Sequence, residues 1–370
     1  MRGFVREVLA TFQGIARNRA ALSTMVAALL IYSVFYPQPY RGEVVREVPM
    51  AVVDQDQSTM SRDFIRRVDV TDSAHVAYRV PDMLAAQDLF FERKIDGIVV
   101  IPPDFEQNLL SGERSPVAYY GDGSYFLLYG AMKSAVLNAA QTLGAEVELS
   151  RLTATGMGYT AARSLVQPIT ITNIRVFNPQ GGYASYVVPA AFILIMQQTL
   201  MMGIGMMHSS QSRQKGGIAL AAPTAYVLLY AFWSLLYLVI LPSAYGIPRI
   251  GEVSALFLLV LPFLCAVTAL GHAVAALIPW KEGVVFFFVV LGMPLFLISG
   301  ISWPIEEIPR ALHLLTLLIP STSVISGTVR IDQMGADLSS VLDVVYIQLA
   351  LTGLYSAVTY LTRWLKNEEI

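Results

Sequence analysis

Residues 253–278 read VSALFLLVLPFLCAVTALGHAVAALI, an apolar stretch without a single Asp, Glu, Lys or Arg. A helix of that length crosses the roughly 30 Å hydrocarbon core of a bilayer. Comparable stretches recur along the chain, and the predicted membrane spans are residues 20–36, 183–207, 223–245, 253–278, 283–300 and 341–362. We therefore predict an α-helical integral membrane protein with about six transmembrane helices.

The composition of the 370-residue chain supports this class. Hydrophobic residues make up 55% of it and charged residues only 14%, whereas soluble domains carry about a quarter charged residues. The formal net charge of −2 gives no indication of nucleic-acid binding. The one cysteine, Cys265, lies inside an apolar stretch, which excludes a disulfide framework and a cysteine-based metal site.

Residues 1–19 predict a cytoplasmic amphipathic helix on the membrane surface, because apolar residues recur there at helical spacing among arginines. Residues 20–36 follow as the first transmembrane helix. A basic start before an apolar run is also typical of a signal peptide. The run is long for that role and lacks a small-residue cleavage motif, so the sequence favours an uncleaved anchor.

Residues 37–182 are polar and charged, and they alternate between short strand and helix patterns. The predicted strands are residues 49–53, 76–80, 97–101, 117–120 and 169–177, and the predicted helices begin at Ser58, Met83, Asp104 and Ser124. Strands separated by helices are typical of an α/β domain. We predict that this inserted domain is extracytoplasmic and that residues 183–370 form a transmembrane bundle of five helices.

The distribution of Lys and Arg orients the spans. Basic residues gather at the N-terminus, after the second span, before the fifth span and after the last one, and the outer loops hold few. Because cytoplasmic loops carry the excess of positive charge, both termini are predicted to be cytoplasmic and residues 37–182 to be outside. The predicted location is the bacterial inner (cytoplasmic) membrane.

Residues 301–340, between the fifth and sixth spans, fit neither a plain loop nor a span. The apolar stretch 308–319 is too short to cross the bilayer, and prolines flank it. Non-helical backbone at membrane depth is tolerated only where protein or a water-filled cavity shields it. We predict a re-entrant outer segment that acts as a gate, with the candidate gate residues Gly300, Pro304, Glu306, Pro309 and Pro320.

No motif for catalysis or nucleotide binding occurs in the sequence. The histidines form no paired motif and no P-loop is present, so ATP-driven work has to come from a partner chain. Asp54-x-Asp56 could suggest a metal site, but a turn with helix capping ahead of Ser58 is the favoured interpretation. Gly203-x-Gly205 lies inside a predicted span and predicts close helix packing.

A few polar side chains interrupt the predicted spans. Gln197, Gln198 and His272 either line a pathway for cargo or hydrogen-bond neighbouring helices, and both roles remain open. The spans hold almost no charged side chains, which ion-coupled transporters usually need in mid-membrane. The sequence therefore favours an amphipathic or hydrophobic cargo.

Four segments carry a family resemblance: VPMAVVDQDQSTMSRDFIRRV (48–68), IDGIVVIPPDFEQNLLSGE (95–113), IRVFNPQGGYASYVVPA (174–190) and LISGISWPIEEIPRALHLLTLLIPSTSVISGTVR (297–330). They resemble the type-two ABC exporter permeases of the subgroup with a large extracytoplasmic domain after the first span. The resemblance covers nearly the whole chain, and the order of the predicted parts agrees with it.

The resemblance implies a permease subunit that is not an enzyme and binds no cofactor itself. In that family two permease subunits pair as a homo- or heterodimer, and each docks a cytoplasmic ABC ATPase subunit that binds ATP and Mg. Many members also work with a periplasmic membrane-fusion protein, and the cargoes are drugs, lipids or glycan-linked molecules. The expected function is export of such a cargo from the cytoplasm or the inner leaflet.

The family's loop after the second span commonly carries a Glu and a Gly-Thr pattern that contact the ATPase. Residues 206–226 keep Gly216 and Pro223 but lack the Glu and the Thr. We predict that the ATPase acts on helix 1–19 and on the loop 208–222, whose basic side chains can pair with an acidic groove. The candidate coupling residues are Arg6, Arg17, Arg213, Lys215, Gly216 and Lys281.

A membrane-anchored sensor or assembly scaffold with a ligand-binding extracytoplasmic domain is the alternative. Such a receptor needs little from its spans, so the elaborate segment 301–340 fits it poorly. A membrane-embedded enzyme is disfavoured because the spans contain no paired acid and base and no set of metal ligands.

Overall fold

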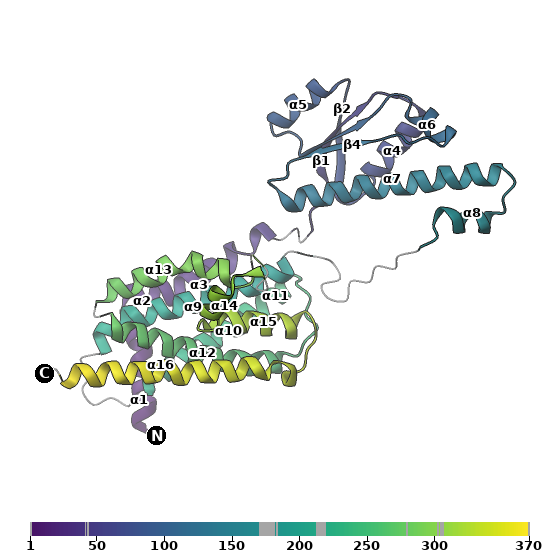
Figure 1. Cartoon of the computed structure of the whole chain (residues 1–370). Helices are drawn as coiled ribbons and strands as arrows, with labels where there is room; N and C mark the ends of the chain where they lie inside the picture. The colour runs from purple at the N-terminus through teal and green to yellow at the C-terminus, as the bar shows by residue number, and fades with distance from the viewer. Residues whose placement is uncertain are drawn as a thin grey trace. The chain divides into compact units, whose positions relative to one another are not determined.

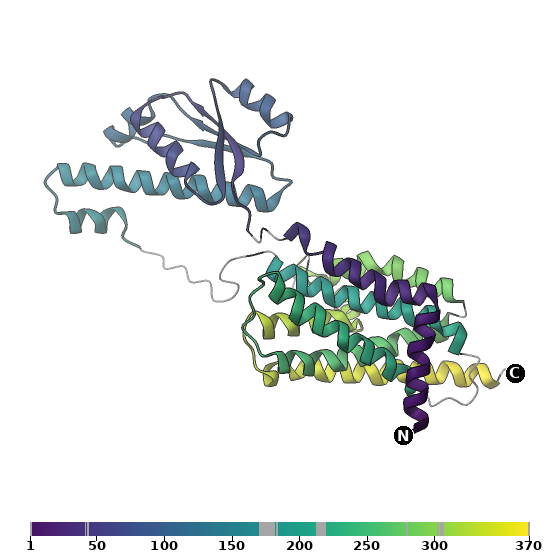
Figure 2. The same ribbon diagram turned by 180° about the vertical axis from the view of Figure 1, so that it is seen from behind.

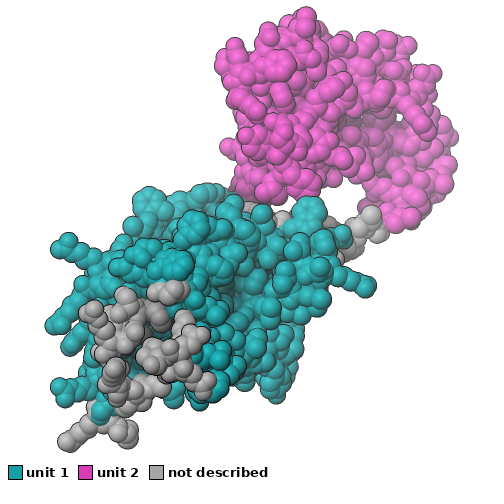
Figure 3. All heavy atoms as spheres, turned by 60° about the vertical axis from the view of Figure 1, so that its left-hand side comes forward, with its two compact units in different colours: residues 1–43, 175–370 teal, residues 44–174 magenta. Residues whose placement is uncertain are grey.

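The computed structural model describes residues 2–40, 42, 44–169, 182, 184–211, 220–278, 280–301, 303 and 307–368. The side chains of residues 2, 208–211 and 366–368 are also outside the description. The chain divides into two compact units, one made of residues 1–43 and 175–370 and the other of residues 44–174 (Figures 1 and 3). We call the first the helical unit and the second the sheet unit.

The helical unit contains a short N-terminal group of helices and a longer group that follows the sheet unit. The first group is α1 (Arg2–Arg17), α2 (Arg19–Leu22), a π-helical turn (Ser23–Ala27), α3 (Ala28–Phe35) and a 3-10 turn (Gln38–Tyr40). The second is α9 (Ala184–Gln211), α10 (Ala221–Leu235), a π-helical turn (Leu236–Ile240), α11 (Leu241–Ala244), α12 (Val253–Leu277), α13 (Lys281–Ile298), α14 (Arg310–Thr316), α15 (Pro320–Asp332), a 3-10 turn (Leu338–Val341) and α16 (Leu342–Glu368).

Six helical stretches of the described chain are long and apolar enough to cross a membrane. They are Arg19–Tyr40, Ala184–Met207, Ala221–Ala244, Val253–Leu277, Lys281–Ile298 and Leu338–Leu365. Each coincides with a span predicted from the sequence to within a few residues. α10 begins before Pro223, since a proline in the first helical turn breaks no intrahelical hydrogen bond. The predicted helical membrane protein with about six spans is confirmed at this level.

Helix α9 is the most enclosed of these spans. A Cβ atom on Gly203 would lie 2.3 Å from the side chain of Met25, and one on Gly205 would lie 2.5 Å from Val284 Cγ1. Helices in lipid associate through close packing of small residues rather than through a hydrophobic driving force. The predicted packing role of Gly203-x-Gly205 is therefore confirmed.

Helix α1 is amphipathic, as predicted, and its apolar face is partly covered by protein. Val8 is buried against Ala221 and Ala225 at the start of α10. Asn18, which follows α1, donates a side-chain hydrogen bond to the backbone oxygen of Met206 near the end of α9 (3.4 Å). Both chain ends lie at the same end of the helical unit (Figures 1 and 2).

The sheet unit contains the four strands and four helices predicted for residues 49–152. They are β1 (Val48–Asp54), α4 (Thr59–Asp69), β2 (Ala74–Val80), α5 (Met83–Phe91), β3 (Gly97–Ile101), α6 (Phe105–Ser111), β4 (Ala118–Gly121) and α7 (Phe126–Ala154). A further helix, α8 (Tyr159–Val166), was not predicted. The predicted strand 169–177 lies outside the described residues from residue 170 on.

The sheet has the order β2-β1-β3-β4, with β4 antiparallel to β3 and the other pairs parallel. Successive side chains of β1 point to opposite faces, so Met50 and Val52 pack against α4, α6 and α7, whereas Ala51 and Val53 pack on the side of α5. The sheet is thus covered on both faces, and β3 is buried as expected for a central parallel strand.

The two carboxylates after β1 stabilise local backbone. Asp54 Oδ1 accepts from the Gln57 backbone N–H (2.9 Å), and Asp56 Oδ1 accepts from the Phe105 N–H at the start of α6 (3.0 Å). The turn-and-cap interpretation is therefore correct, with the difference that Asp56 caps α6. Over the described ranges, no group of three or more His, Cys, Asp or Glu side chains could bind a metal.

Candidate functional site

The segment between α13 and α16 forms a bent helix pair, α14 and α15, whose axes differ by 86°. α15 contacts α9, α12 and α16, and nine of its residues are buried. The length and composition of the pair fit a re-entrant segment, as predicted, or a broken span. Either way, the turn 317–319 is largely exposed, whereas α15 begins at Pro320 and Ser321, which are both buried within the helical unit.

Two glutamines from neighbouring spans contact the start of α15. Gln197 of α9 and Gln348 of α16 are both fully buried. The Ser321 backbone N–H donates to Gln197 Oε1 (2.9 Å). Gln348 Nε2 donates to the Pro320 carbonyl oxygen (2.9 Å) and to Ser323 Oγ (2.8 Å). Gln197 therefore accepts from a first-turn N–H that has no partner within α15, whereas Gln348 adds a donor from α16 to the Pro320 carbonyl oxygen.

The start of α15 also contains buried polar side-chain atoms that make no hydrogen bond within the described residues. Gln197 Nε2, Gln348 Oε1, Ser321 Oγ and Thr322 Oγ1 are buried and have no hydrogen-bond partner among the described residues. A buried polar group without a partner costs about 1–3 kcal/mol. We call Gln197, Ser321, Thr322 and Gln348 the polar cluster. Only some of the hydrogen-bonding atoms of the polar cluster have a partner in this arrangement.

The other end of α15 carries an ion pair with little access to solvent. Arg249 Nε, in the connection before α12, lies 2.9 Å from Asp332 Oδ1, and the two side chains are 15% and 9% exposed. The Ile250 backbone N–H donates to the Asp332 carbonyl oxygen (2.8 Å). Gln333 donates to the Ser185 carbonyl oxygen at the start of α9. This end of α15 is thereby fixed to α9 and α12.

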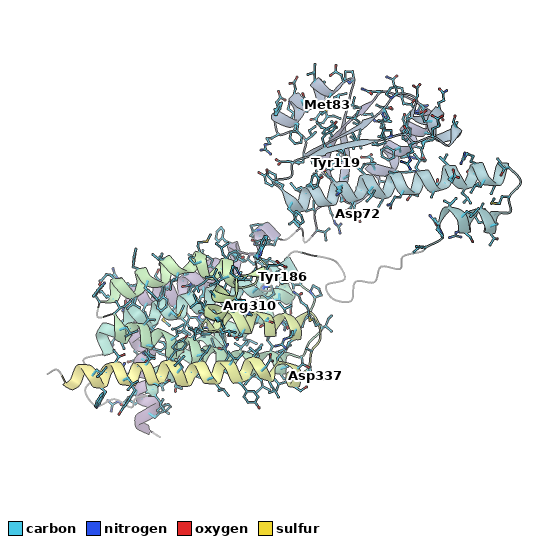
Figure 4. The ribbon with its side chains drawn as sticks, viewed as in Figure 1. Asp72, Met83, Tyr119, Tyr186, Arg310 and Asp337 are labelled. Atoms are coloured by element: carbon cyan, nitrogen blue, oxygen red, sulfur yellow. The ribbon has the colours of Figure 1, made fainter. Side chains whose placement is uncertain are left out.

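Further contacts connect the bent helix pair to the adjoining spans. Arg330 of α15 forms an ion pair with Asp343 of α16 (3.0 Å), whose side chain is 62% exposed. The Tyr186 hydroxyl donates to the Gly300 carbonyl oxygen just after α13 (2.5 Å), and Figure 4 labels Tyr186 and, at the start of α14, Arg310. The end of α13 and the end of α15 are therefore both linked to the start of α9.

The candidate gate residues fall at the ends of these elements. Gly300 has a positive φ of 84° and accepts the Tyr186 hydrogen bond. Pro309 is the N-cap residue of α14, and Pro320 is the first residue of α15. Pro304 and Glu306 lie outside the described residues.

The three pathway candidates do not lie together. Gln197 contacts the start of α15, as described above. Gln198 Nε2 lies 3.7 Å from the position of a Cβ on Gly292 of α13. The His272 ring on α12 lies near the Tyr226 ring of α10, with 5.9 Å between centroids. Each of the three therefore faces a different helix.

The coupling candidates that the structure describes are exposed. Arg6 and Arg17 lie on the exposed side of α1. Lys281, at the start of α13, is also exposed, and its Nζ lies 3.7 Å from Glu282 Oε1. Arg213, Lys215 and Gly216 lie outside the described residues. Since α1 contacts the end of α9 and the start of α10, it adjoins both helices that flank the loop containing these three.

A separate groove of about 530 Å³ lies on the sheet unit between α4, α6 and α7. Its lining is mainly apolar and includes Met60, Leu143 and Val147. At its rim, Arg67 pairs with Asp63 (2.7 Å) and Glu146 (2.6 Å). Hydrogen bonds from Arg67 and then Arg66 lower the pKa of the Asp63 carboxyl below its usual value, so the rim charges are compensated within the unit.

Sequence reasoning missed Gln348 and the pair Arg249–Asp332. The segment around Gln348 (YIQLALTG) shows a lone amide in an apolar span, the same signal that identified Gln197. Arg249 and Asp332 are far apart in sequence, and only their meeting in the fold identifies them as partners.

Comparisons with known proteins agree on a transport family. Residues 20–361 match the family model described as ABC-2 family transporter protein. A relative described as a linearmycin resistance permease protein, from Bacillus subtilis (strain 168), is 24% identical over 337 residues, covering 85% of this chain and 86% of that protein.

Proposed function

Because the chain belongs to the ABC-2 family of transporter proteins, we propose that it is the permease subunit of an exporter driven by a separate ABC ATPase. The observation that carries this proposal is the family match over residues 20–361, which includes the candidate spans almost completely and the bent helix pair. Family membership makes the chain a multi-pass transport subunit that is not itself catalytic and that works with an ATP-binding subunit. Export, cargo and orientation are the further parts of the proposal.

The orientation follows from charge. Arg6, Arg17 and Lys281 are exposed on elements that the positive-inside rule assigns to the cytoplasm. Both chain ends lie at one end of the helical unit (Figures 1 and 2), which agrees with an even number of spans. The sheet unit would then lie outside the bacterial inner membrane, as in the subgroup that the sequence resembles.

The cargo is proposed to be amphipathic or hydrophobic, such as a drug or lipid-like molecule. The spans hold almost no charged side chains, so a charged cargo would find no counter-ions there. The name of the Bacillus subtilis relative connects that protein with resistance to linearmycin, which agrees with this class. Gln198 and His272 remain candidates for contact with the cargo, and the bent helix pair is the proposed outer gate.

ATP hydrolysis in the partner subunit would act on the permease through α1 and the loop 208–222. α1 contacts both helices that flank this loop, so a push on α1 moves the inner ends of α9 and α10. A second permease subunit would complete the pathway, and a periplasmic membrane-fusion protein could continue it. A sensor or scaffold is disfavoured, because it has no use for a polar-contacted helix such as α15 enclosed among spans.

Association with the ATPase gives the direct test of this function. Purification of the wild-type chain from its native membrane is expected to bring down a soluble ATP-hydrolysing protein. Reversing the charge at Arg213 and Lys215, or at Arg6 and Arg17, is expected to weaken that association about two- to thirtyfold, since each of the two lost charge pairs contributes about 0.2–1 kcal/mol.

The matched control is Arg114→Glu, which reverses an exposed charge on the sheet unit. It is expected to leave the association and the ATPase activity unchanged. Recovery of the wild-type chain without any ATPase would refute the proposed function. Unchanged association in both charge-reversed variants would refute the proposed coupling surface alone.

A further inference from the structure

We propose that Gln197 and Gln348 are positioning residues that hold α15 in its closed place through hydrogen bonds of opposite direction, and that their release opens the gate. The inference rests on the proposed function, because a gate has a role only in a chain that moves cargo. It deepens that function by assigning the closed state to two side chains on separate spans.

The first argument is the position of the contact. α15 begins among α9, α12 and α16, where water does not reach the first N–H groups of the helix. Gln197 accepts from the Ser321 N–H, and Gln348 donates to the Pro320 carbonyl oxygen. Without Gln197, the Ser321 N–H would be buried without a partner, and without Gln348 the start of α15 would lose its hydrogen bonds to α16. The two glutamines therefore stabilise the buried start of α15, directly after the bend, in an apolar environment.

The second argument is that the polar cluster is incompletely satisfied. Gln197 Nε2, Gln348 Oε1 and Ser321 Oγ have no hydrogen-bond partner within the described part of the chain. A fully satisfied buried network rigidifies a structure, whereas a partly satisfied one is costly. These atoms gain partners when water enters, so opening recovers part of the energy lost with the two glutamine contacts. Such a contact suits an element that has to open and close repeatedly.

The opposite directions of the two contacts give a selective test. A glutamate at position 197 keeps an acceptor for the Ser321 N–H, and a negative charge is favourable at a helix N-terminus. A glutamate at position 348 loses the donor once it is ionised at alkaline pH and then places a carboxylate against the Pro320 carbonyl oxygen, whereas the protonated carboxyl can still donate there. The same substitution is therefore tolerated at one site and disruptive at the other. A role in filling space alone predicts equal outcomes, because Gln and Glu have nearly the same shape.

The readout is the rate at which a reporter cysteine on α15 is modified. In a Cys265→Ala background the chain has no other cysteine, and Thr328→Cys places a thiol at a position that is 2% exposed. The full-length chain in lipid nanodiscs is treated with a membrane-impermeant maleimide. Gln348→Glu and Gln197→Met are expected to raise the labelling rate about tenfold, the factor expected for one unsatisfied buried group. Gln197→Glu is expected to stay within about threefold of the parent.

Thr268→Val on α12 is the matched control, because the Thr268 side chain is also buried and its hydroxyl also lacks a hydrogen-bond partner among the described residues. It is expected to leave the rate unchanged. If Gln197→Met does not accumulate as folded protein, the two glutamate variants, labelled at alkaline pH where their carboxyls ionise, decide the question alone. Equal rates for Gln197→Glu and Gln348→Glu would overturn the inference. The assay uses neither ATPase nor cargo, so its failure is distinct from failure of the proposed function.

Discussion

Replacing Arg249 with Ala is expected to destabilise the C-terminal end of α15 by about 3–5 kcal/mol, because it leaves the buried Asp332 carboxylate without its cation. The Asp332 side chain is only 9% exposed, so water cannot take over the role of the guanidinium. The double variant Arg249→Met, Asp332→Leu is expected to recover most of the loss, since an apolar pair carries no desolvation cost.

Amide hydrogen exchange on the full-length protein measures this effect. The reporter is the Ile250 N–H, which donates to the Asp332 carbonyl oxygen, and its protection is expected to fall by about two to four powers of ten. Arg330→Ala is the matched control, because its partner Asp343 is 62% exposed. Arg330→Ala is expected to lower the local stability of α15 by less than about 1 kcal/mol. An equal loss of protection in the two single variants would show that burial of the pair is unimportant.

Replacing Phe64 with Ala is expected to cost the sheet unit about 3–5 kcal/mol, through lost burial and the cavity left behind. Phe64 is 1% exposed, and its ring centroid lies 6.1 Å from that of Phe105. A single domain is typically stable by about 5–15 kcal/mol. The variant therefore loses a large part of the stability of this unit.

The expected observation is faster amide exchange throughout β1 and β3 with unchanged exchange in α9 and α12. The two units have separate hydrophobic cores, so the loss should stay in one of them. Leu84→Ala, at a side chain that is 72% exposed, is the control and should change stability by less than about 0.5 kcal/mol. Spread of the faster exchange into α9 would contradict the independence of the two cores.

The architecture was predictable because its signals are local in sequence. A hydrocarbon-length apolar run identifies a span without knowledge of its neighbours, and the helix Met83–Phe91 was predicted to the residue. The antiparallel direction of β4 was not predicted, since pairing direction depends on where the chain returns. α8 was missed because its eight residues are fewer than the window over which a helical period can be recognised.

The candidate site was predictable only in part, because its contacts join residues that are far apart in sequence. Gln197 and Pro320 were selected separately, as a polar residue in a span and as a proline at a helix boundary. Their meeting at the start of α15, together with Gln348, depends on the packing of three helices. A sequence can show that a polar side chain is buried in a span, but its partner is a property of the fold.

Cysteine labelling in sealed, right-side-out membrane vesicles tests the central claim most directly: a membrane subunit with its sheet unit outside and both ends in the cytoplasm. In the Cys265→Ala background, Leu84→Cys reports on the sheet unit and Gly3→Cys on the N-terminal helix, and both positions are exposed. The account predicts that a membrane-impermeant maleimide modifies Leu84→Cys in sealed vesicles and modifies Gly3→Cys only after lysis. Modification of Gly3→Cys in sealed vesicles, or protection of Leu84→Cys until lysis, would contradict it.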